Sequence, residues 1–288
     1  MITRLAILCI TSLIWACGPQ VKEDKVEITQ AKIITAGGTV SEVVAALGFE
    51  DNIIATDITS TYPAALKELP SIGYRNQIKA EGILAFGADF LLAEEGYLSE
   101  DVVSQLQSSG ISVKFFEKPT SIDQTYSLIA EIAEFLNVQD KGVKVVDSLK
   151  ADEAELNAYL QQNPVESPPK VAFIMARGLE TVFLAGEDTF AHEIITMAGG
   201  KPAGQGFKDF IPLTPEAMVS LNPDYLLFFE SGLATIGGTD GISQLKGVDQ
   251  TIAFQNKQFL SYDGQYLSGF GPRVAKATLD LAKGIRNN

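Results

Sequence analysis

Aromatic and basic side chains recur in the segments that follow predicted strands. The aromatic residues are Tyr62, Tyr74, Tyr97, Phe207, Phe229, Tyr266 and Phe270, and the basic residues are Arg75, Arg177, Lys208 and Arg273. Such segments meet at one edge of an open parallel sheet, which is where ligands bind in folds of this kind. Aromatic rings pack against apolar molecules, and cationic side chains pair with carboxylates. The residue types therefore predict a slot for a flat, apolar ligand that carries carboxylate groups.

Tyr74 is a candidate metal ligand within this set. Ferric iron in a porphyrin takes four ligands from the macrocycle, so the protein need supply only an axial donor, and a tyrosine phenolate can serve. The residues alone leave a simpler alternative, which is a tyrosine at the rim of the slot with its hydroxyl group hydrogen-bonded. A zinc or manganese site usually needs two or three histidines. The chain has one, His192, so we do not expect such a site.

The residues do not predict an enzyme. The sequence has no Gly-x-Ser-x-Gly nucleophile motif and no Walker-type phosphate loop. The glycines at 237–241 lack the Lys-Ser/Thr pair that would follow in such a loop. His192 falls in the first turn of a helix predicted after Thr189, where imidazole rings commonly face solvent.

A long internal repeat indicates how these residues are positioned. Gly73-Tyr-Arg recurs as Gly206-Phe-Lys, and two acidic pairs in the segments that follow share one spacing. Glu81 and Glu216 are 135 residues apart (216 − 81), as are Asp89 and Asp224 (224 − 89). This period is too long for a solenoid, whose repeats span roughly 20–50 residues. It predicts one helix–strand unit used in each of two similar lobes.

Short apolar runs alternate with helical patterns on both sides of a long helix. Strands are predicted at residues 31–35, 52–56, 90–93, 113–116, 170–175, 181–185, 225–229 and 258–262. Strands that alternate with helices predict parallel sheets. We therefore expect an α/β protein with two Rossmann-like lobes, at residues 30–139 and 165–288, joined by a single backbone helix at 140–164. At 1.5 Å per residue, this helix would be roughly 30 Å long.

The net charge argues against a nucleic-acid partner. The chain has 36 acidic and 22 basic residues, a formal net charge of −14, whereas binding to nucleic acid needs a basic face. The composition, with 46% hydrophobic residues, is that of a globular protein. A few local cations can still attract a small anionic ligand to a cleft.

Residues 1–17 have the pattern of a secretory leader. Arg4 precedes an apolar stretch at 5–15 that is too short to span a bilayer, and Ala16-Cys17 follows. A small residue before cysteine resembles a bacterial lipobox, which predicts cleavage before Cys17, a lipid on its thiol, and a tether at 18–29. The alternative is an ordinary secretory signal with an incidental cysteine. Either pattern predicts a protein of the periplasm or cell envelope, and the lipobox predicts a membrane anchor.

Several segments resemble the heme-binding substrate-binding proteins of bacterial ABC importers. They are residues 59–63 (TSTYP), 69–74 (LPSIGY), 80–84 (AEGIL), 185–189 (AGEDT), 197–200 (MAGG), 237–241 (GGTDG) and 267–273 (LSGFGPR). The resemblance covers about residues 30–286. It implies a class III periplasmic binding protein, a relative of the cobalamin and siderophore binding proteins, with two α/β lobes joined by one rigid helix. It also implies that the protein is not an enzyme.

The resemblance implies heme b as the transported ligand and Tyr74 as the axial ligand of its iron. In the family this tyrosine follows Gly and stands seven residues before the Glu of Ala-Glu-Gly, as Tyr74 does relative to Glu81. Family members often carry Arg two residues after the tyrosine, where this chain has Asn76, with Arg75 one position early. The heme-contacting residues expected here are Tyr74, Arg75, Tyr62, Tyr97, Arg177, Phe207, Lys208 and Tyr266.

The resemblance also implies a partner, the permease dimer of an ABC importer. In this superfamily one glutamate per lobe pairs with permease arginines, and the matched positions here are Glu81 and Glu216. A carboxylate in the first turn of a helix is also favoured by the helix dipole, by about 0.3–1 kcal/mol, which leaves simple helix stabilisation as an alternative. We expect a monomer, and a siderophore or cobalamin is the alternative cargo.

Overall fold

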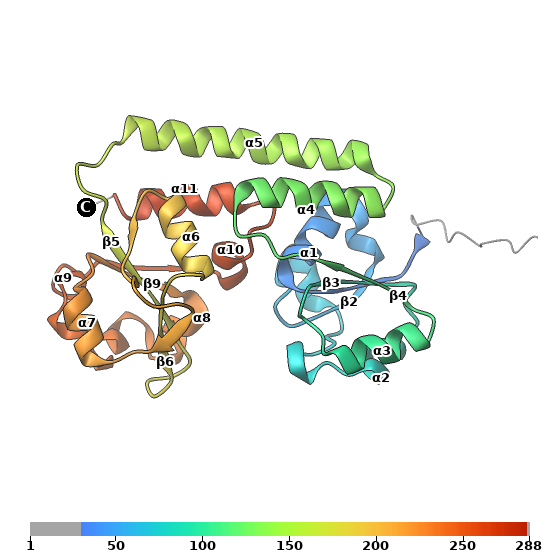
Figure 1. Ribbon diagram of the computed structural model, residues 1–288, viewed down its shortest axis with the longest axis horizontal. Helices are drawn as coiled ribbons and strands as arrows, with labels where there is room; N and C mark the ends of the chain where they lie inside the picture. Colours follow the sequence, from blue (N-terminus) through green and yellow to red (C-terminus); the bar gives the residue numbers. More distant parts are fainter. Residues whose placement is uncertain (1–29, 287–288) are drawn as a thin grey trace, which may run out of the picture.

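Two α/β lobes lie side by side, and the long helix α5 (Gln139–Gln162) runs along both of them (Figure 1). The structure is a computed structural model that describes residues 30–286. The predicted leader, the tether and Cys17 lie outside the described residues. The predicted fold class, two α/β lobes joined by one long helix, is confirmed.

The N-terminal lobe is built on an all-parallel sheet in the order β2-β1-β3-β4. Its strands are β1 (Ile33–Ala36), β2 (Ile53–Thr56), β3 (Phe90–Glu94) and β4 (Ser112–Phe116). Its helices and helical turns are α1 (Gly38–Val44), η2 (Ala45–Phe49), η3 (Glu50–Asn52), η4 (Ala64–Glu68), η5 (Arg75–Gln77), α2 (Ala80–Leu84), α3 (Glu100–Ser108) and α4 (Ile122–Phe135). The central strands are apolar and buried on both faces, as a covered parallel sheet requires.

The C-terminal lobe contains a mixed sheet instead of the predicted parallel one, in the order β10-β9-β5-β6-β8, with β7 paired to β5. Its strands are β5 (Lys170–Ala176), β6 (Val182–Ala185), β7 (Lys201–Pro202), β8 (Phe210–Pro212), β9 (Tyr225–Phe229) and β10 (Phe259–Tyr262). Strands β5, β9 and β10 are parallel, whereas β6 is antiparallel to β5 and β8 to β6. The connection from β5 to β6 is only residues 177–181, too short for the crossover that a parallel pair needs.

The remaining elements of this lobe are helical. They are α6 (Phe190–Met197), α7 (Pro215–Leu221), α8 (Glu230–Thr235), η6 (Gly238–Gln244), η7 (Val248–Gln250), α9 (Ile252–Gln255), α10 (Gly264–Ser268) and α11 (Val274–Gly284). The two copies of the sequence repeat fold alike, since α2 leads into β3 and α7 leads into β9. Glu81 and Glu216 lie in the first turns of α2 and α7.

One hydrophobic core runs through both lobes beneath the long helix. Buried Leu149 and Leu156 of α5 belong to the same cluster as Ile33 of β1 and Phe173 of β5. Each sheet also has a separate core on its other face. Because α5 is packed into the core that both lobes share, it restrains their relative movement. Within residues 30–286, no helix is long and apolar enough to cross a bilayer.

Candidate ligand-binding cleft

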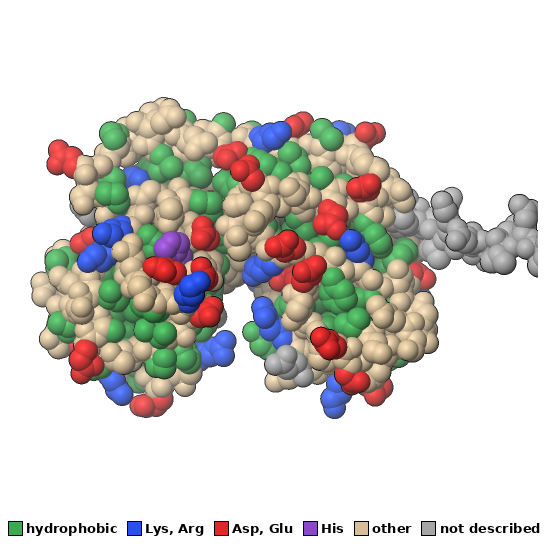
Figure 2. All heavy atoms as spheres, in the orientation of Figure 1, with side chains coloured by type: hydrophobic (Ala, Val, Ile, Leu, Met, Phe, Trp, Pro, Cys, Tyr) green, Lys and Arg blue, Asp and Glu red, His purple; other side chains and the backbone are tan. Residues whose placement is uncertain are grey.

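A cavity of about 490 Å³ lies between the lobes, with residues of both on its walls. Its lining includes Gly38, Thr39, Ile58, Thr59, Tyr74, Arg75, Glu94, Tyr97 and Lys118 from the first lobe and Met175, Arg177, Phe229, Asp263, Gln265 and Gly269 from the second. Figure 2 shows the hollow between the lobes, with basic side chains on both of its walls. The volume is within the range of about 300–1,000 Å³ typical of small-molecule sites.

Tyr74 lies on the wall that the first lobe contributes. The loop after β2 returns along that strand, where Ser71 bridges to Thr56, and then turns at Gly73, whose φ of 103° favours glycine. Tyr74 precedes the helical turn η5, and its carbonyl group accepts a hydrogen bond from the Gln77 N–H at 2.8 Å. The backbone on both sides of Tyr74 is therefore fixed, and its ring contributes to the cavity wall.

Arg75 places its guanidinium group over two tyrosine rings. Its Cζ atom lies 5.9 Å from the centre of the Tyr74 ring and 5.0 Å from that of Tyr97. Cations are attracted to aromatic faces at such distances. Arg75 thus holds a positive charge beside Tyr74 at the cavity surface.

Tyr97 differs from Tyr74 because it is buried and its hydroxyl group is already hydrogen-bonded within the protein. It is 3% exposed, donates a hydrogen bond to a carboxylate oxygen of Asp57, and lies 2.9 Å from the Thr59 hydroxyl oxygen. Burial, together with the negative charge of Asp57, raises the pKa of Tyr97 far above its ordinary value. Tyr97 is therefore a neutral phenol that shapes the wall rather than an available phenolate.

Asp57 organises the loop beneath this wall. The buried carboxylate accepts hydrogen bonds from the N–H groups of Gly37 at 2.9 Å and Thr59 at 2.8 Å, and from the Ser60 hydroxyl at 2.6 Å. A buried carboxylate is tolerated when it is surrounded by donors in this way. The donors come from the ends of two strands, so Asp57 fixes the position of both loops at the cleft.

The wall contributed by the second lobe combines an aromatic cluster with a cation. The Phe229 ring packs edge-on to Phe173 at 4.8 Å and stacks with Phe190 at 5.3 Å. Arg177 follows β5, and its backbone N–H donates to the Thr181 carbonyl at 2.8 Å. The side chain of Arg177 is exposed at the mouth of the cavity.

Three cations face the cavity without an acidic partner. Among the described residues, Arg75, Lys118 and Arg177 form no ion pair with Asp or Glu, so their charges are available to a ligand. Lys118 is absent from the residues predicted from the sequence. It stands two residues after the end of β4, so the rule that identified the other loops also applies to it.

Four of the predicted contact residues lie outside this cavity. Tyr62 stacks against Arg273, with 3.4 Å between the guanidinium carbon and the ring centre. The Tyr266 hydroxyl donates to Asp280 at 2.8 Å, on the side of α11. Lys208 is exposed and paired with Asp188 at 2.7 Å. Phe207 packs against Gly186, at the start of the loop that leads to α6.

His192 is half-buried, so its ring is only partly exposed to solvent. It lies in the first turn of α6, which Thr189 caps, and its Nδ1 atom is buried without a hydrogen-bond partner. No group of His, Cys, Asp and Glu side chains in residues 30–286 is arranged to hold a metal ion.

Two lobes, a packed connecting helix and a cleft with cations on its walls are typical of a binding protein. The chain belongs to the periplasmic binding protein family, whose sequence profile matches residues 33–266. This is a family of substrate-binding proteins rather than enzymes, in agreement with the prediction made from the sequence.

Proteins similar to this chain bind different ligands. The solved structure of the periplasmic heme-binding protein BhuT in complex with two hemes is similar, with a TM-score of 0.84, 29% identity, and coverage of 89% of this chain and 98% of that one. An ABC transporter substrate-binding lipoprotein, YvrC of Bacillus subtilis, is 25% identical over 88% of this chain and 79% of its own length. A vitamin B12-binding protein of Photorhabdus laumondii is 22% identical over 89% and 88%.

Proposed function

We propose that this protein is an extracytoplasmic substrate-binding lipoprotein that captures heme between its lobes and delivers it to an ABC permease. The observation that carries the proposal is the position of Tyr74, on the wall of the interlobe cavity and beside Arg75. Similarity to heme-binding proteins of the same fold supports the choice of ligand.

The proposed bond joins the Tyr74 phenolate oxygen to ferric heme iron. A porphyrin supplies four equatorial nitrogens, so a site without other metal ligands can still bind the metal through one oxygen. The Arg75 guanidinium, 5.9 Å from the ring, offsets the negative charge of a phenolate on this wall. Tyr97 is excluded from this role because its hydroxyl group is bonded to Asp57.

The remaining walls suit the rest of a heme molecule. Lys118 and Arg177 are exposed cations at the cavity, and charge-assisted hydrogen bonds from such groups would hold the two propionates. Met175 and Phe229 offer apolar surface to the macrocycle from the opposite wall. Strand β5, which precedes Arg177, contains no histidine, so we propose no second axial ligand from this strand.

Anchoring and delivery belong to the same proposal. Cys17 would carry the lipid that keeps the protein at the membrane. Glu81 and Glu216 are exposed and begin equivalent helices in the two lobes, which supports their role as permease contacts. Neither forms an ion pair within residues 30–286, so both carboxylates are free to meet arginines of a partner. We propose that the protein acts as a monomer.

Cobalamin is the second candidate ligand, because relatives that match most of this chain bind vitamin B12. The two ligands can be separated by titrating the purified protein with hemin and with cyanocobalamin in parallel. We expect a shifted Soret band that saturates with hemin, and no change in thermal stability with cyanocobalamin. Saturable binding of cyanocobalamin, with free-hemin spectra throughout the other titration, would reject heme as the ligand. Failure of both would leave a siderophore as the next ligand to test.

A further inference from the structure

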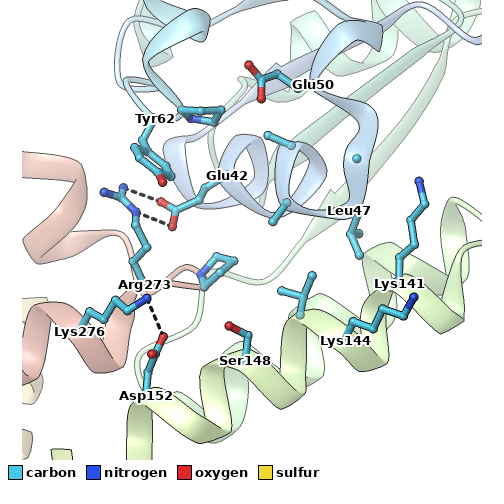
Figure 3. Close-up of a pocket in the computed structure, with 16 residues that line it drawn as sticks. Glu42, Leu47, Glu50, Tyr62, Lys141, Lys144, Ser148, Asp152, Arg273 and Lys276 are labelled. Atoms are coloured by element: carbon cyan, nitrogen blue, oxygen red, sulfur yellow. Dashed lines mark hydrogen bonds and ion pairs between the residues drawn. The ribbon is translucent and has the colours of Figure 1, made fainter. Parts of the chain in front are cut away.

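A buried ion pair joins the two lobes behind the cleft. Glu42 of α1 accepts two hydrogen bonds from Arg273 at the start of α11, from Nε and from Nη2, each at 2.8 Å. The Glu42 side chain is 4% exposed and that of Arg273 is 22% exposed. Figure 3 shows the two side chains pointing at each other from the helices of different lobes. A paired contact of this kind fixes orientation as well as distance.

Gln265 of α10 extends this contact across the loop after β2. Its Oε1 atom accepts from the N–H groups of Thr61 at 2.6 Å and Tyr62 at 2.9 Å. Its Nε2 atom donates to the Gly38 carbonyl at 2.7 Å and to Glu42 at 3.2 Å. The Tyr62 ring in turn lies against the Arg273 guanidinium. We call Glu42, Tyr62, Gln265 and Arg273 the interlobe seam.

One seam residue, Gln265, also lines the cleft, at a point where the two lobes meet. Gly38, Thr39, Gln265 and Gly269 line the cavity, and the Thr39 hydroxyl donates to the Gly269 carbonyl at 2.5 Å. A side chain at position 38 would place its Cβ 2.9 Å from the Thr59 carbonyl oxygen and 3.0 Å from Gln265. The lobes therefore approach each other here as closely as glycine allows.

The seam is separate from the other contacts between the lobes, which include the shared core, α5 and a hydrogen bond from the Thr125 hydroxyl of α4 to the Phe270 carbonyl at 2.8 Å. Glu42, Tyr62 and Arg273 share a second pocket, of about 540 Å³, with Lys144 and Ser148 of α5. Gln265 lines the cleft itself, so the seam stands between the long helix and the cavity. Apolar packing in the shared core has no direction, whereas the paired hydrogen bonds of Glu42 and Arg273 also fix the orientation of the lobes.

From these contacts we infer that Arg273 is a positioning residue, whose pairing with Glu42 sets the separation of the two cleft walls. The wall that carries Tyr74 and the wall that carries Arg177 belong to different lobes, so their spacing depends on this pair. A planar ligand held at its metal and at its carboxylates requires that spacing to be fixed. The part of the inference that concerns the ligand depends on the proposed heme-binding function; the part that concerns lobe separation does not.

A neighbouring ion pair provides a matched control. Lys276 on α11 pairs with Asp152 of α5 at 3.3 Å, in the same pocket (Figure 3). This contact joins α11 to the connecting helix and does not reach α1. Loss of the pair should therefore leave the separation of the walls unchanged.

The direct test measures the lobe separation without a ligand. Nitroxide labels are placed at Ser108→Cys on α3 and Ser220→Cys on α7, which are both exposed, with Cys9 and Cys17 replaced by Ser. Pulsed EPR then gives the distance distribution for the parent, Arg273→Lys, Glu42→Gln and Asp152→Asn. We expect a broader or displaced distribution for the two seam variants and the parental one for Asp152→Asn. Parental distributions in folded seam variants would overturn the inference.

A double variant keeps the test valid if a single change prevents folding. Replacing both members of a buried ion pair by apolar residues often preserves stability, whereas removing one member does not. Glu42→Met with Arg273→Met should therefore fold with a parental melting temperature, yet show the broadened distance distribution. A parental distribution in this variant would show that the pair does not set the separation.

Hemin titration of the same proteins tests the consequence for binding. We expect at least a tenfold weaker hemin affinity in Arg273→Lys and in the Met pair, through faster release, and parental affinity in Asp152→Asn. Parental affinity in variants with altered distances would reject the link to ligand binding. If the parent itself does not bind hemin, the proposed function fails, and the EPR result still decides whether the seam positions the lobes.

Discussion

At the scale of single residues, two tyrosines near one cleft have opposite environments. Tyr97 is buried and bonded to Asp57, whereas Tyr74 lies on the cavity wall beside an arginine. The same side-chain type therefore supplies a neutral structural group at one position and a candidate ligand at the other. Both tyrosines were predicted as contact residues. The sequence could not distinguish them, because the Tyr97 hydroxyl is bonded to Asp57, which lies 40 residues away along the chain.

The cations at the cavity should determine affinity for a ligand with carboxylates. We predict that Arg177→Ala weakens hemin binding by about 10- to 100-fold, since a hydrogen bond to a charged group contributes roughly 1.5–3 kcal/mol. Lys208→Ala is the control, because Lys208 is exposed, paired with Asp188 and outside the cavity. Hemin titration monitored by absorbance gives both affinities. Equal losses in the two variants would indicate a general effect of net charge instead of a contact.

Buried tyrosines should make the fold sensitive to alkali. Burial and the nearby charge of Asp280 raise the pKa of Tyr262 to about 12, and burial with Asp57 raises the pKa of Tyr97 further. An unfolded tyrosine ionises near pH 10. Above that pH the unfolded chain releases protons that the folded chain keeps, so stability falls as pH rises. We expect a lower urea midpoint at pH 10.5 than at pH 8.5.

The contribution of these tyrosines to the loss of stability can be separated from the general charge repulsion within the protein at high pH. Tyr97→Phe cannot ionise, so the difference between its urea midpoints at the two pH values should be smaller than in the parent. A pH dependence identical to that of the parent would contradict the assignment of Tyr97 as a buried, neutral phenol.

At the scale of elements, the packing of α5 against α4 depends on one glycine. A Cβ atom at Gly142 would lie 2.6 Å from the Cβ of Ala133. Alanine favours helices over glycine by about 1 kcal/mol, yet this contact should make Gly142→Ala destabilising, by about 1–3 kcal/mol from overpacking. Urea denaturation measures the change. Adding Ala133→Gly should relieve the contact and recover part of the loss; no recovery would place the strain elsewhere.

The sequence predicted the long or strongly patterned elements and missed the short ones. Strand β9 occurs at the predicted residues, and α5 begins and ends within two residues of the predicted helix. The short elements β8 and α10 were not predicted, because a few residues carry too little periodicity. A signal for α10 existed in Asp263, whose carboxylate caps that helix by accepting from the Tyr266 N–H at 2.9 Å.

At the scale of the whole molecule, the cleft depends on contacts between distant segments. The repeat and the alternation of strands and helices predicted two lobes and the edge where ligands bind. They could not predict that Glu42 pairs with Arg273, 231 residues later, because nothing in the local pattern of either segment depends on the other. For the same reason Arg273 was predicted to be one of the cations beside the ligand, although it forms an ion pair with Glu42 of the other lobe.

The central claim is a bond between Tyr74 and ferric heme iron, and the most direct measurement is the absorption and EPR spectrum of the hemin complex. The parent should show a shifted Soret band and a high-spin ferric signal with a phenolate-to-iron charge-transfer band. Tyr74→Phe should lose that band and the signal, whereas Tyr126→Phe, remote on α4 and bonded to Glu153, should keep both. An unchanged spectrum in Tyr74→Phe would contradict the account.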